Sequence, residues 1–210
     1  MKALCVLTQS LIALAAFACT SVKALVEHAK ANPGQLLYGS SGVGGVGHIP
    51  TEMLKRAAGN LDIVHVPYKG DNEVAQELVN ERLSMAFATP GTTLPQIKAE
   101  KFRALAVTSK ARSPALPDVP TTTEAGLPDF QISGWNAIFG PKDMPDDIQT
   151  ALTGALDKAL SNPDVAKKLT DLGTVIPNAE QRTPTGLAAT LARDMKLLEA
   201  PLKASGVVIK

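Results

Sequence analysis

A glycine-rich stretch constrains the fold of this chain more than any other segment. It runs from Tyr38 to His48 with the sequence YGSSGVGGVGH and follows an apolar run at residues 36–38. Residues 49–58 then place apolar side chains at helical spacing, with Pro50 in the first turn, where a missing N–H group costs nothing. The segment is therefore predicted to be a strand, a tight turn and the start of a helix.

Such a turn is a natural place to bind an anion. The first N–H groups of a helix have no partners within the helix, and the helix dipole is positive at that end. Glycines let the backbone approach a ligand closely, and the hydroxyl groups of Ser40 and Ser41 add hydrogen-bond donors. The alternative is a tight turn without a ligand, because many glycine-rich turns between a strand and a helix have none.

Residues 42–47 also match the dinucleotide-binding fingerprint G-x-G-x-x-G, so an NAD(P)-binding oxidoreductase domain is the second interpretation. The fingerprint requires an acidic residue at the far end of the next strand, roughly 20 residues on, to bind the ribose. Asp62 has about the right spacing, but it precedes the next apolar run at residues 63–66, and the following acid is Asp71. The match alone is therefore weak support for dinucleotide binding.

The chain around this stretch alternates between strand and helix patterns. Near-continuous apolar runs that predict strands occur at residues 36–38, 63–66, 84–88 and 103–108. This alternation predicts an α/β fold with a four-stranded parallel sheet and helices on both faces. Ligands bind outside the carboxyl ends of such strands, so one edge should hold the turns 40–47, 68–72 and 89–93.

These three turns supply the candidate ligand-binding residues. Lys69 could clamp a negative charge and His48 could donate a hydrogen bond, although a solvated lysine and a packed histidine are the commoner outcomes. No nucleophile, base and orienting group assemble into a catalytic set, so we expect a binding protein and not an enzyme. The full candidate set is Ser40, Ser41, Gly42, Val43, Gly44, His48, Tyr68, Lys69, Thr89 and Pro90.

Composition argues against two further classes of function. A net charge of +1, with no basic run that contains interleaved aromatic residues, gives no indication of nucleic-acid binding. The two cysteines, Cys5 and Cys19, have no metal-ligand spacing with the three histidines. We therefore expect neither a metal site nor a cofactor.

The two ends of the chain show other patterns. Residues 1–19 have the outline of an export signal, but a strand at residues 4–7 followed by a linker explains them equally well. They are too short and too interrupted for a bilayer-spanning helix, which needs about 20 apolar residues. After an extended crossover, the chain becomes mostly helical, with apolar stripes at Ile148, Leu152, Leu156 and Leu160 and at Leu187, Leu191, Met195, Leu198 and Leu202.

Several motifs together resemble the substrate-binding component of tripartite tricarboxylate transporters, the Bug-type periplasmic receptors. The similarity runs from about Val22 to the end of the chain, and its motifs are His48 and the ranges 38–42, 62–70, 103–109, 112–121, 124–128 and 200–207. It implies a two-lobed fold like that of type II periplasmic binding proteins. Residues 22–134 would form the ligand-binding α/β lobe, residues 135–210 the crossover and the C-terminal helical part of the other lobe, and residues 1–21 a strand remnant or signal-like segment.

The resemblance also implies a function. Receptors of this kind capture small carboxylates in the periplasm and deliver them to membrane permease subunits. They hold the carboxylate between two loops, one from each lobe, largely through backbone N–H groups, hydroxyl groups and water. The glycine turn would supply one of these loops, in agreement with the anion site expected at a helix start.

One departure from the family pattern has structural consequences. Family members are considerably longer, because an N-terminal lobe carries a glycine-rich loop of its own, and no loop like Pro-Phe-x-x-Gly-Gly occurs here. Residues 4–10 are similar to the family's strand that enters the second lobe, which favours a chain that starts late. A truncated fragment that binds no ligand is then an alternative to a receptor. The C-terminal stripes would lack a partner surface, which predicts self-association through exposed helices.

Overall fold

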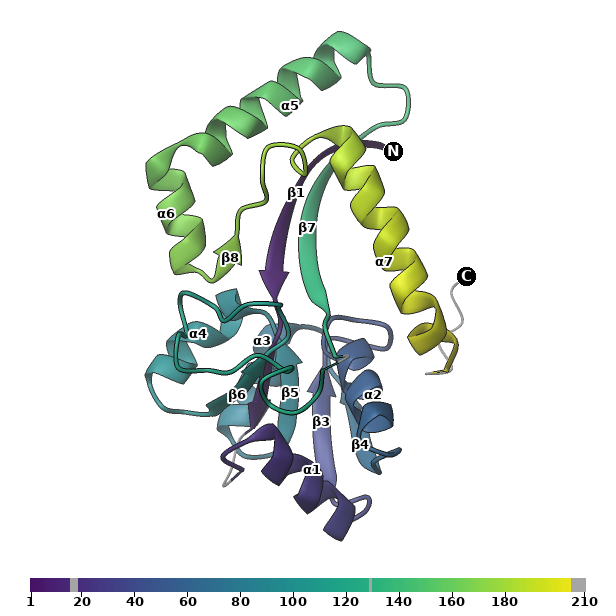
Figure 1. Cartoon of the computed structure of the whole chain (residues 1–210), viewed down its shortest axis with the longest axis vertical. Coiled ribbons are helices and arrows are strands. Elements are labelled where there is room, and N and C mark those ends of the chain that lie inside the picture. The colour runs from purple at the N-terminus through teal and green to yellow at the C-terminus, as the bar shows by residue number, and fades with distance from the viewer. Residues whose placement is uncertain (16–18, 129, 205–210) are drawn as a thin grey trace.

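The computed structural model describes residues 1–15, 19–128 and 130–204, which form two sheets (Figure 1). The larger sheet has five strands in the order β4-β3-β5-β2-β6, and the smaller has three in the order β7-β1-β8. The strands are β1 (Lys2–Ser10), β2 (Ile12–Ala15), β3 (Leu36–Ser40), β4 (Ile63–Pro67), β5 (Met85–Ala88), β6 (Arg103–Val107), β7 (Ser133–Gly140) and β8 (Thr174–Val175).

Within the described ranges, four helices cover the larger sheet and three accompany the smaller one (Figure 1). Ser21 starts the first helix, because its side chain accepts a hydrogen bond from the Ala24 N–H (3.1 Å), as a helix cap should. The helices are α1 (Val22–Ala31), α2 (His48–Ala57), α3 (Asp71–Val79), α4 (Pro90–Lys98), α5 (Asp146–Ser161), α6 (Pro163–Asp171) and α7 (Pro184–Ala204).

The larger sheet contains the four predicted strands and one further strand, β2, that the sequence does not predict. β3 pairs in parallel with β4 on one side and with β5 on the other. β2 lies between β5 and β6 and is antiparallel to both. The four predicted strands all run parallel to one another, since β5 and β6 are both antiparallel to β2, and this prediction is confirmed. The sequence pattern misses β2 because it assigns residues 12–15 to a linker or signal. The α/β class itself is confirmed.

Leu11 and Thr108 hold the inserted strand against β6. The Leu11 N–H donates to the Thr108 Oγ1 (3.0 Å), and the Thr108 N–H donates to the Leu11 carbonyl oxygen (2.9 Å). The Thr108 hydroxyl donates to the same carbonyl oxygen (3.2 Å). Because both residues are buried, these bonds satisfy backbone groups that water cannot reach.

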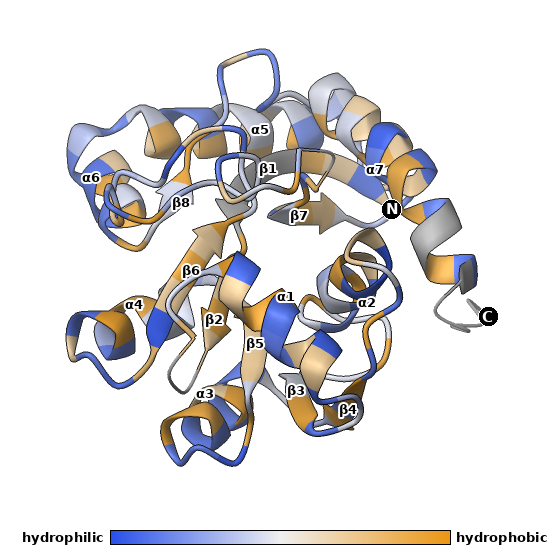
Figure 2. Ribbon diagram, turned by 60° about the horizontal axis from the view of Figure 1, so that its bottom comes forward, coloured by the Kyte–Doolittle hydropathy of each residue, from blue (hydrophilic) through white to orange (hydrophobic). Residues whose placement is uncertain are grey.

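Alternate residues of β2 face opposite halves of the core. Ala13 and Ala15 belong to the cluster packed by α1 and α2, whereas Ile12 and Leu14 belong to the cluster packed by α3 and α4. Figure 2 shows the apolar strands of this sheet lying between the helices. The expected coverage of both faces by helices is therefore confirmed.

β1 connects the two sheets. It runs antiparallel to β7 from the pair Lys2 with Gly140 to the pair Ser10 with Ser133, and the chain enters β2 one residue later. Figure 1 shows β1 and β7 as two long strands side by side. The prediction of a strand at residues 4–7 is thus confirmed. The sequence predicts a linker after this strand; instead, residues 8–10 continue β1 and residues 12–15 form β2.

The C-terminal helices leave part of their apolar surface exposed. Ile148 and Leu152 on α5 are exposed, and so are Met195 and Leu197 on α7, where the Met195 side chain is 72% exposed. Leu187 at the start of α7 is fully buried. None of the helices in the described part of the chain combines the length and the apolar character needed to cross a bilayer.

Replacing Leu14 by alanine tests whether β2 is packed into the sheet. Leu14 is buried in the cluster formed with α3 and α4, so Leu14→Ala should lower the free energy of unfolding by about 2–5 kcal/mol, because it leaves a cavity. Urea denaturation of the full chain measures this change. Leu172→Ala is the control: it removes an exposed leucine and should change the free energy of unfolding by less than about 0.5 kcal/mol. Equal effects would mean that residues 12–15 are not packed in the core.

Candidate ligand-binding site

The carboxyl ends of β3, β4 and β5 lie at one edge of the larger sheet, because these strands are parallel to one another. Each leads into a helix, so α2, α3 and α4 all begin at this edge (Figure 1). A cavity of about 430 Å³ lies there and contacts all three turns. Its lining residues are Ser41 from the first turn, Lys69, Gly70, Asp71, Asn72 and Glu73 from the second, and Thr92 from the start of α4. The expected convergence of the turns is confirmed.

The glycine turn is shaped by hydrogen bonds within itself. Gly42 (φ +113°) and Gly44 (φ +81°) have left-handed backbone conformations that residues with side chains rarely adopt. The Gly45 N–H donates to the Gly42 carbonyl oxygen (3.1 Å). Val43 at the tip is exposed, and the N–H groups of Val43 and Val46 donate to no other residue in the described ranges. These two N–H groups can therefore donate to an anion.

Gly47 sets how closely the turn approaches β5. A Cβ atom at this position would lie 2.8 Å from the Phe87 carbonyl oxygen and 3.2 Å from the Gly39 carbonyl oxygen. The backbone φ of Gly47 is −86°, which any residue can adopt. Glycine is therefore required at position 47 because the turn lies so close to β3 and β5, and not because of its backbone conformation.

Two of the predicted ligand contacts lie behind the turn. Ser40 is buried, and its hydroxyl donates to the Gly42 carbonyl oxygen (3.0 Å) and contacts the His65 Nε2 (2.7 Å). His48 is also buried, and its Nδ1 accepts a hydrogen bond from the Gly44 N–H (3.3 Å). Both side chains support the shape of the turn, and the Gly44 N–H is directed at His48.

The second turn is tied to the first and contains charges of both signs. The Tyr68 N–H donates to the Ser40 carbonyl oxygen (2.8 Å). Lys69 is exposed, and its backbone N–H donates to the Glu73 Oε2 (3.1 Å). Because Asp71 and Glu73 line the same cavity as Lys69, their two negative charges exceed the single positive charge of Lys69.

The third turn contacts the segment next to the smaller sheet. The Thr89 carbonyl oxygen accepts hydrogen bonds from the hydroxyl groups of Thr92 (3.0 Å) and Thr93 (2.9 Å) at the start of α4. Pro90 is buried, and a Cβ atom on Gly173, between α6 and β8, would lie 2.5 Å from the Pro90 Cβ. The turn between α6 and β8 therefore packs directly against the start of α4.

The sequence analysis missed a polar cluster beneath the glycine turn. The Tyr38 hydroxyl and the Lys55 ammonium both donate to the Glu52 Oε1, at 2.8 Å and 2.7 Å. Burial and the Glu52 carboxylate raise the pKa of the Tyr38 hydroxyl. Burial acts to raise the pKa of Glu52, but hydrogen bonds from Lys55 and Tyr38 hold it below its ordinary value. The sequence holds one signal for the cluster: His65 interrupts an apolar strand, and an imidazole in such a position needs hydrogen-bond partners.

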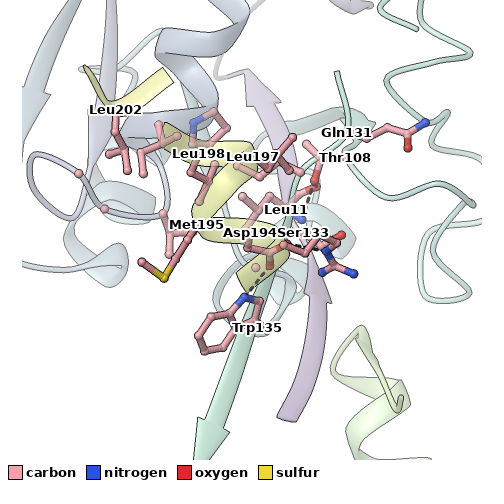
Figure 3. Close-up of a pocket in the computed structure, with 18 of the residues that line it drawn as sticks. Leu11, Thr108, Gln131, Ser133, Trp135, Asp194, Met195, Leu197, Leu198 and Leu202 are labelled. Atoms are coloured by element: carbon pink, nitrogen blue, oxygen red, sulfur yellow. Dashed lines mark hydrogen bonds and ion pairs between the residues drawn. The ribbon is translucent and has the colours of Figure 1, made fainter. Parts of the chain in front are cut away.

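A second cavity, of about 770 Å³, lies between the glycine turn, β7 and α7 (Figure 3). The Trp135 indole N–H donates to the Asp194 Oδ2 (2.8 Å), and the Arg193 Nε donates to the Asp194 Oδ1 (2.7 Å). Leucines of α7, among them Leu191 and Leu198, add an apolar wall. No local pattern indicates this cavity, because its lining residues come from segments far apart in the chain.

The glycine turn does not have the arrangement of a dinucleotide site. Asp62 lies at the opposite edge of the sheet, where its carbonyl oxygen accepts a hydrogen bond from the Gly34 N–H (3.0 Å). The Gly44 N–H, at the glycine whose backbone should approach the pyrophosphate, donates to His48 instead. A metal is not indicated either, since no group of three His, Cys, Asp or Glu in the described part of the chain is placed to hold one.

A family model described as the tripartite tricarboxylate transporter family receptor matches residues 2–201. The chain belongs to this family. The match includes both sheets and all three turns at the candidate site. The resemblance seen in the sequence motifs is therefore confirmed.

Individual members of this family are similar to the chain over most of its length. A UPF0065 protein of Agrobacterium vitis, from the TAR-I ttuE-ttuC' intergenic region, is 37% identical over 182 residues, which is 87% of this chain and 52% of the relative. An R. palustris protein solved with adipate has a TM-score of 0.92 at 27% identity, covering 99% of this chain and 69% of that one. The periplasmic binding protein BugD has a TM-score of 0.88 at 26% identity, covering 98% and 69%. The chain thus spans about half the length of its curated relative.

Gly47→Ala should destabilise the protein, because its Cβ would press on the Phe87 carbonyl oxygen. Gly70→Ala is the matched control, since both glycines precede a helix and a Cβ on Gly70 would meet nothing within 4 Å. We expect the free energy of unfolding of Gly47→Ala to lie about 1–3 kcal/mol below that of Gly70→Ala. Chemical denaturation of the two variants measures the difference, and equal stability would contradict the close packing of the turn on β5.

Proposed function

We propose that the chain acts as a solute-binding receptor that captures a small carboxylate for a tripartite tricarboxylate transport system. The observation that carries the proposal is that the starts of α3 and α4 meet the glycine turn around one cavity. Each helix start has a partial positive charge and N–H groups without partners in the helix. A carboxylate in this cavity is stabilised by two such ends and by the glycine turn beside them, which a single turn cannot provide.

The contacts to the carboxylate come mainly from neutral donors of the first turn. The Val43 N–H group, which follows Ser41 and Gly42 in the turn, has no partner among the described residues, and Ser41 lines the cavity. Lys69 contributes less, because Asp71 and Glu73 compete for its charge. The proposal therefore assigns binding to the backbone and hydroxyl groups of this turn.

Partners and location follow from family membership. We propose permease subunits in the membrane as the recipients of the ligand, and the periplasm as the compartment, as for BugD. We also propose that residues 22–134 form the ligand-binding lobe and residues 135–210 the crossover and helical part of the other lobe, with residues 1–21 as a separate short segment. A binding role without catalysis agrees with the description of the family as receptors.

Isothermal titration calorimetry with adipate, and separately with NAD, tests the proposed function. Adipate should release or absorb heat on binding and NAD should not. Ser41→Ala should weaken adipate binding by about fivefold to tenfold, the equivalent of about 1 kcal/mol for one hydroxyl hydrogen bond.

Ser133→Ala is the control for this experiment, because Ser133 lines the larger cavity instead. It should leave the affinity unchanged. A loss of binding in Ser133→Ala with none in Ser41→Ala would move the site to the larger cavity. Binding of NAD but of no carboxylate would favour the oxidoreductase interpretation.

We also propose that the chain self-associates through α7, whose Met195 and Leu197 side chains are exposed. Burying exposed apolar side chains against a second copy removes them from water, which favours association. Size-exclusion chromatography with light scattering should show a mass that rises with protein concentration. The double variant Met195→Lys/Leu197→Lys should remain a monomer, whereas Lys196→Ala between them should behave like the parent chain. A parent chain that is monomeric at all concentrations would contradict this proposal.

A further inference from the structure

Three rings from three different elements lie together directly behind the glycine turn. Parallel pairing of β3 with β4 places Tyr38 opposite His65, and their rings stack with centroids 4.7 Å apart and planes at 19°. The first turn of α2 places His48 against the same pair, with its ring centroid 4.6 Å from that of His65 and 6.3 Å from that of Tyr38. The two imidazoles therefore share one largely enclosed space, and each bonds to the turn in front of it.

The hydrogen bonds define where the protons of the two imidazoles must lie. The Gly44 N–H donates to the His48 Nδ1, so this nitrogen must have a free lone pair. The Ser40 hydroxyl has one hydrogen, which it donates to the Gly42 carbonyl oxygen. Its short contact with His65 (2.7 Å) is then satisfied when the His65 Nε2–H donates to the Ser40 oxygen. In this arrangement His48 is neutral, with its proton on Nε2, and His65 also has a proton on Nε2.

The charged groups around the pair do little to favour a positive imidazole. These groups are Glu52 and Lys55 of α2, together with the Tyr38 hydroxyl of β3. The Glu52 carboxylate already accepts hydrogen bonds from the other two. Burial lowers the pKa of His48, Glu52 acts in the opposite direction, and Lys55 lowers it further. Burial also lowers the pKa of His65, and the neighbouring His48 adds to this effect. A positive charge on one ring opposes protonation of the other, because they are so close.

We infer that His48 and His65 are positioning residues for the carboxylate site, and that they hold the glycine turn in its binding conformation only while the His48 imidazole is neutral. The inference rests on the proposed function and adds its regulation by pH. Protonation of the His48 Nδ1 would set an N–H group against the Gly44 N–H. The turn would then lose the bond that orients the peptide next to Val43, whose N–H is free to meet a ligand.

The sign of the pH effect follows from the two pKa values. Both are held below the ordinary value of 6.5, so the native turn favours neutral imidazoles. The hydrogen bond from the Gly44 N–H to the His48 Nδ1 is therefore fully present above about pH 6.5 and is lost as the pH falls through the lowered pKa of His48. The sequence contains three histidines, and the third, His28, lies on the exposed surface of α1.

Variants that keep the hydrogen bonds but cannot titrate test the inference. In His48→Asn the side-chain amide oxygen can take the place of the Nδ1 acceptor, and in His65→Gln the amide NH₂ can take the place of the Nε2 donor. The affinity of the parent chain for adipate should fall more steeply than that of the double variant between about pH 7.5 and about pH 5.5, by a factor below the roughly tenfold that an unshifted histidine would give. The double variant is the reference, because adipate itself begins to take up protons at the acid end. His28→Gln should behave like the parent chain, and parallel profiles for the parent and the double variant would overturn the inference.

A measurement without ligand separates this inference from the proposed function. Nuclear magnetic resonance follows the ring nitrogens of His48 and His65 and the Gly44 amide during an acid titration of the full chain. As the His48 ring becomes charged, the Gly44 amide should lose its protection from hydrogen exchange. The exchange rates are first corrected for the intrinsic dependence of exchange on pH. It should stay protected in His48→Asn and be unprotected at every pH in His48→Leu. A Gly44 amide that stays protected while His48 becomes charged would overturn the inference, and this result does not depend on whether adipate binds.

Discussion

β3 is the strand on which the binding edge depends. It pairs in parallel with β4 and with β5, so three strand ends and three helix starts meet at one edge of the sheet. The Ser40 carbonyl oxygen at its end accepts the Tyr68 N–H, and Gly39 within it leaves room for Leu83 beneath α3. Because the ends of parallel strands share an edge, the register of this one strand decides where all three turns lie.

The glycine turn combines a flexible sequence with a rigid environment. Glycines lose more backbone entropy on ordering than any other residue, so a loose turn of this composition would have to be ordered by its ligand. Here Ser40 and His48 hold the turn from behind before any ligand arrives. This support requires buried polar groups, and hydrogen bonds to partners in the core offset the free-energy cost of burying them. The supporting side chains and the proposed binding surface are therefore on opposite sides of the same loop.

The two sheets meet through β1 and β7. β1 continues into β2 after Leu11, and the segment before β7 is bonded back to the larger sheet, since the Ile132 N–H donates to the Thr108 carbonyl oxygen (3.3 Å). Thr108 thus contacts both segments that connect the two sheets, at Leu11 and at Ile132. The turn at Gly173, between α6 and β8, packs against Pro90, so this turn reaches the start of α4. The relative placement of the two parts depends on these few contacts.

The sequence by itself determined the order of strands, turns and helices from residue 22 to residue 108, and with it the edge that holds the three turns. Glycine content, helix caps and apolar periodicity are local properties, which a single segment expresses without its neighbours. Only the tertiary structure decided that Ser40 and His48 point behind the turn, that His65 joins them, and that β2 enters the sheet between β5 and β6. These features depend on pairing between segments as far apart as Leu11 and Thr108. Local periodicity shows which residues become buried but not which partner they are buried against.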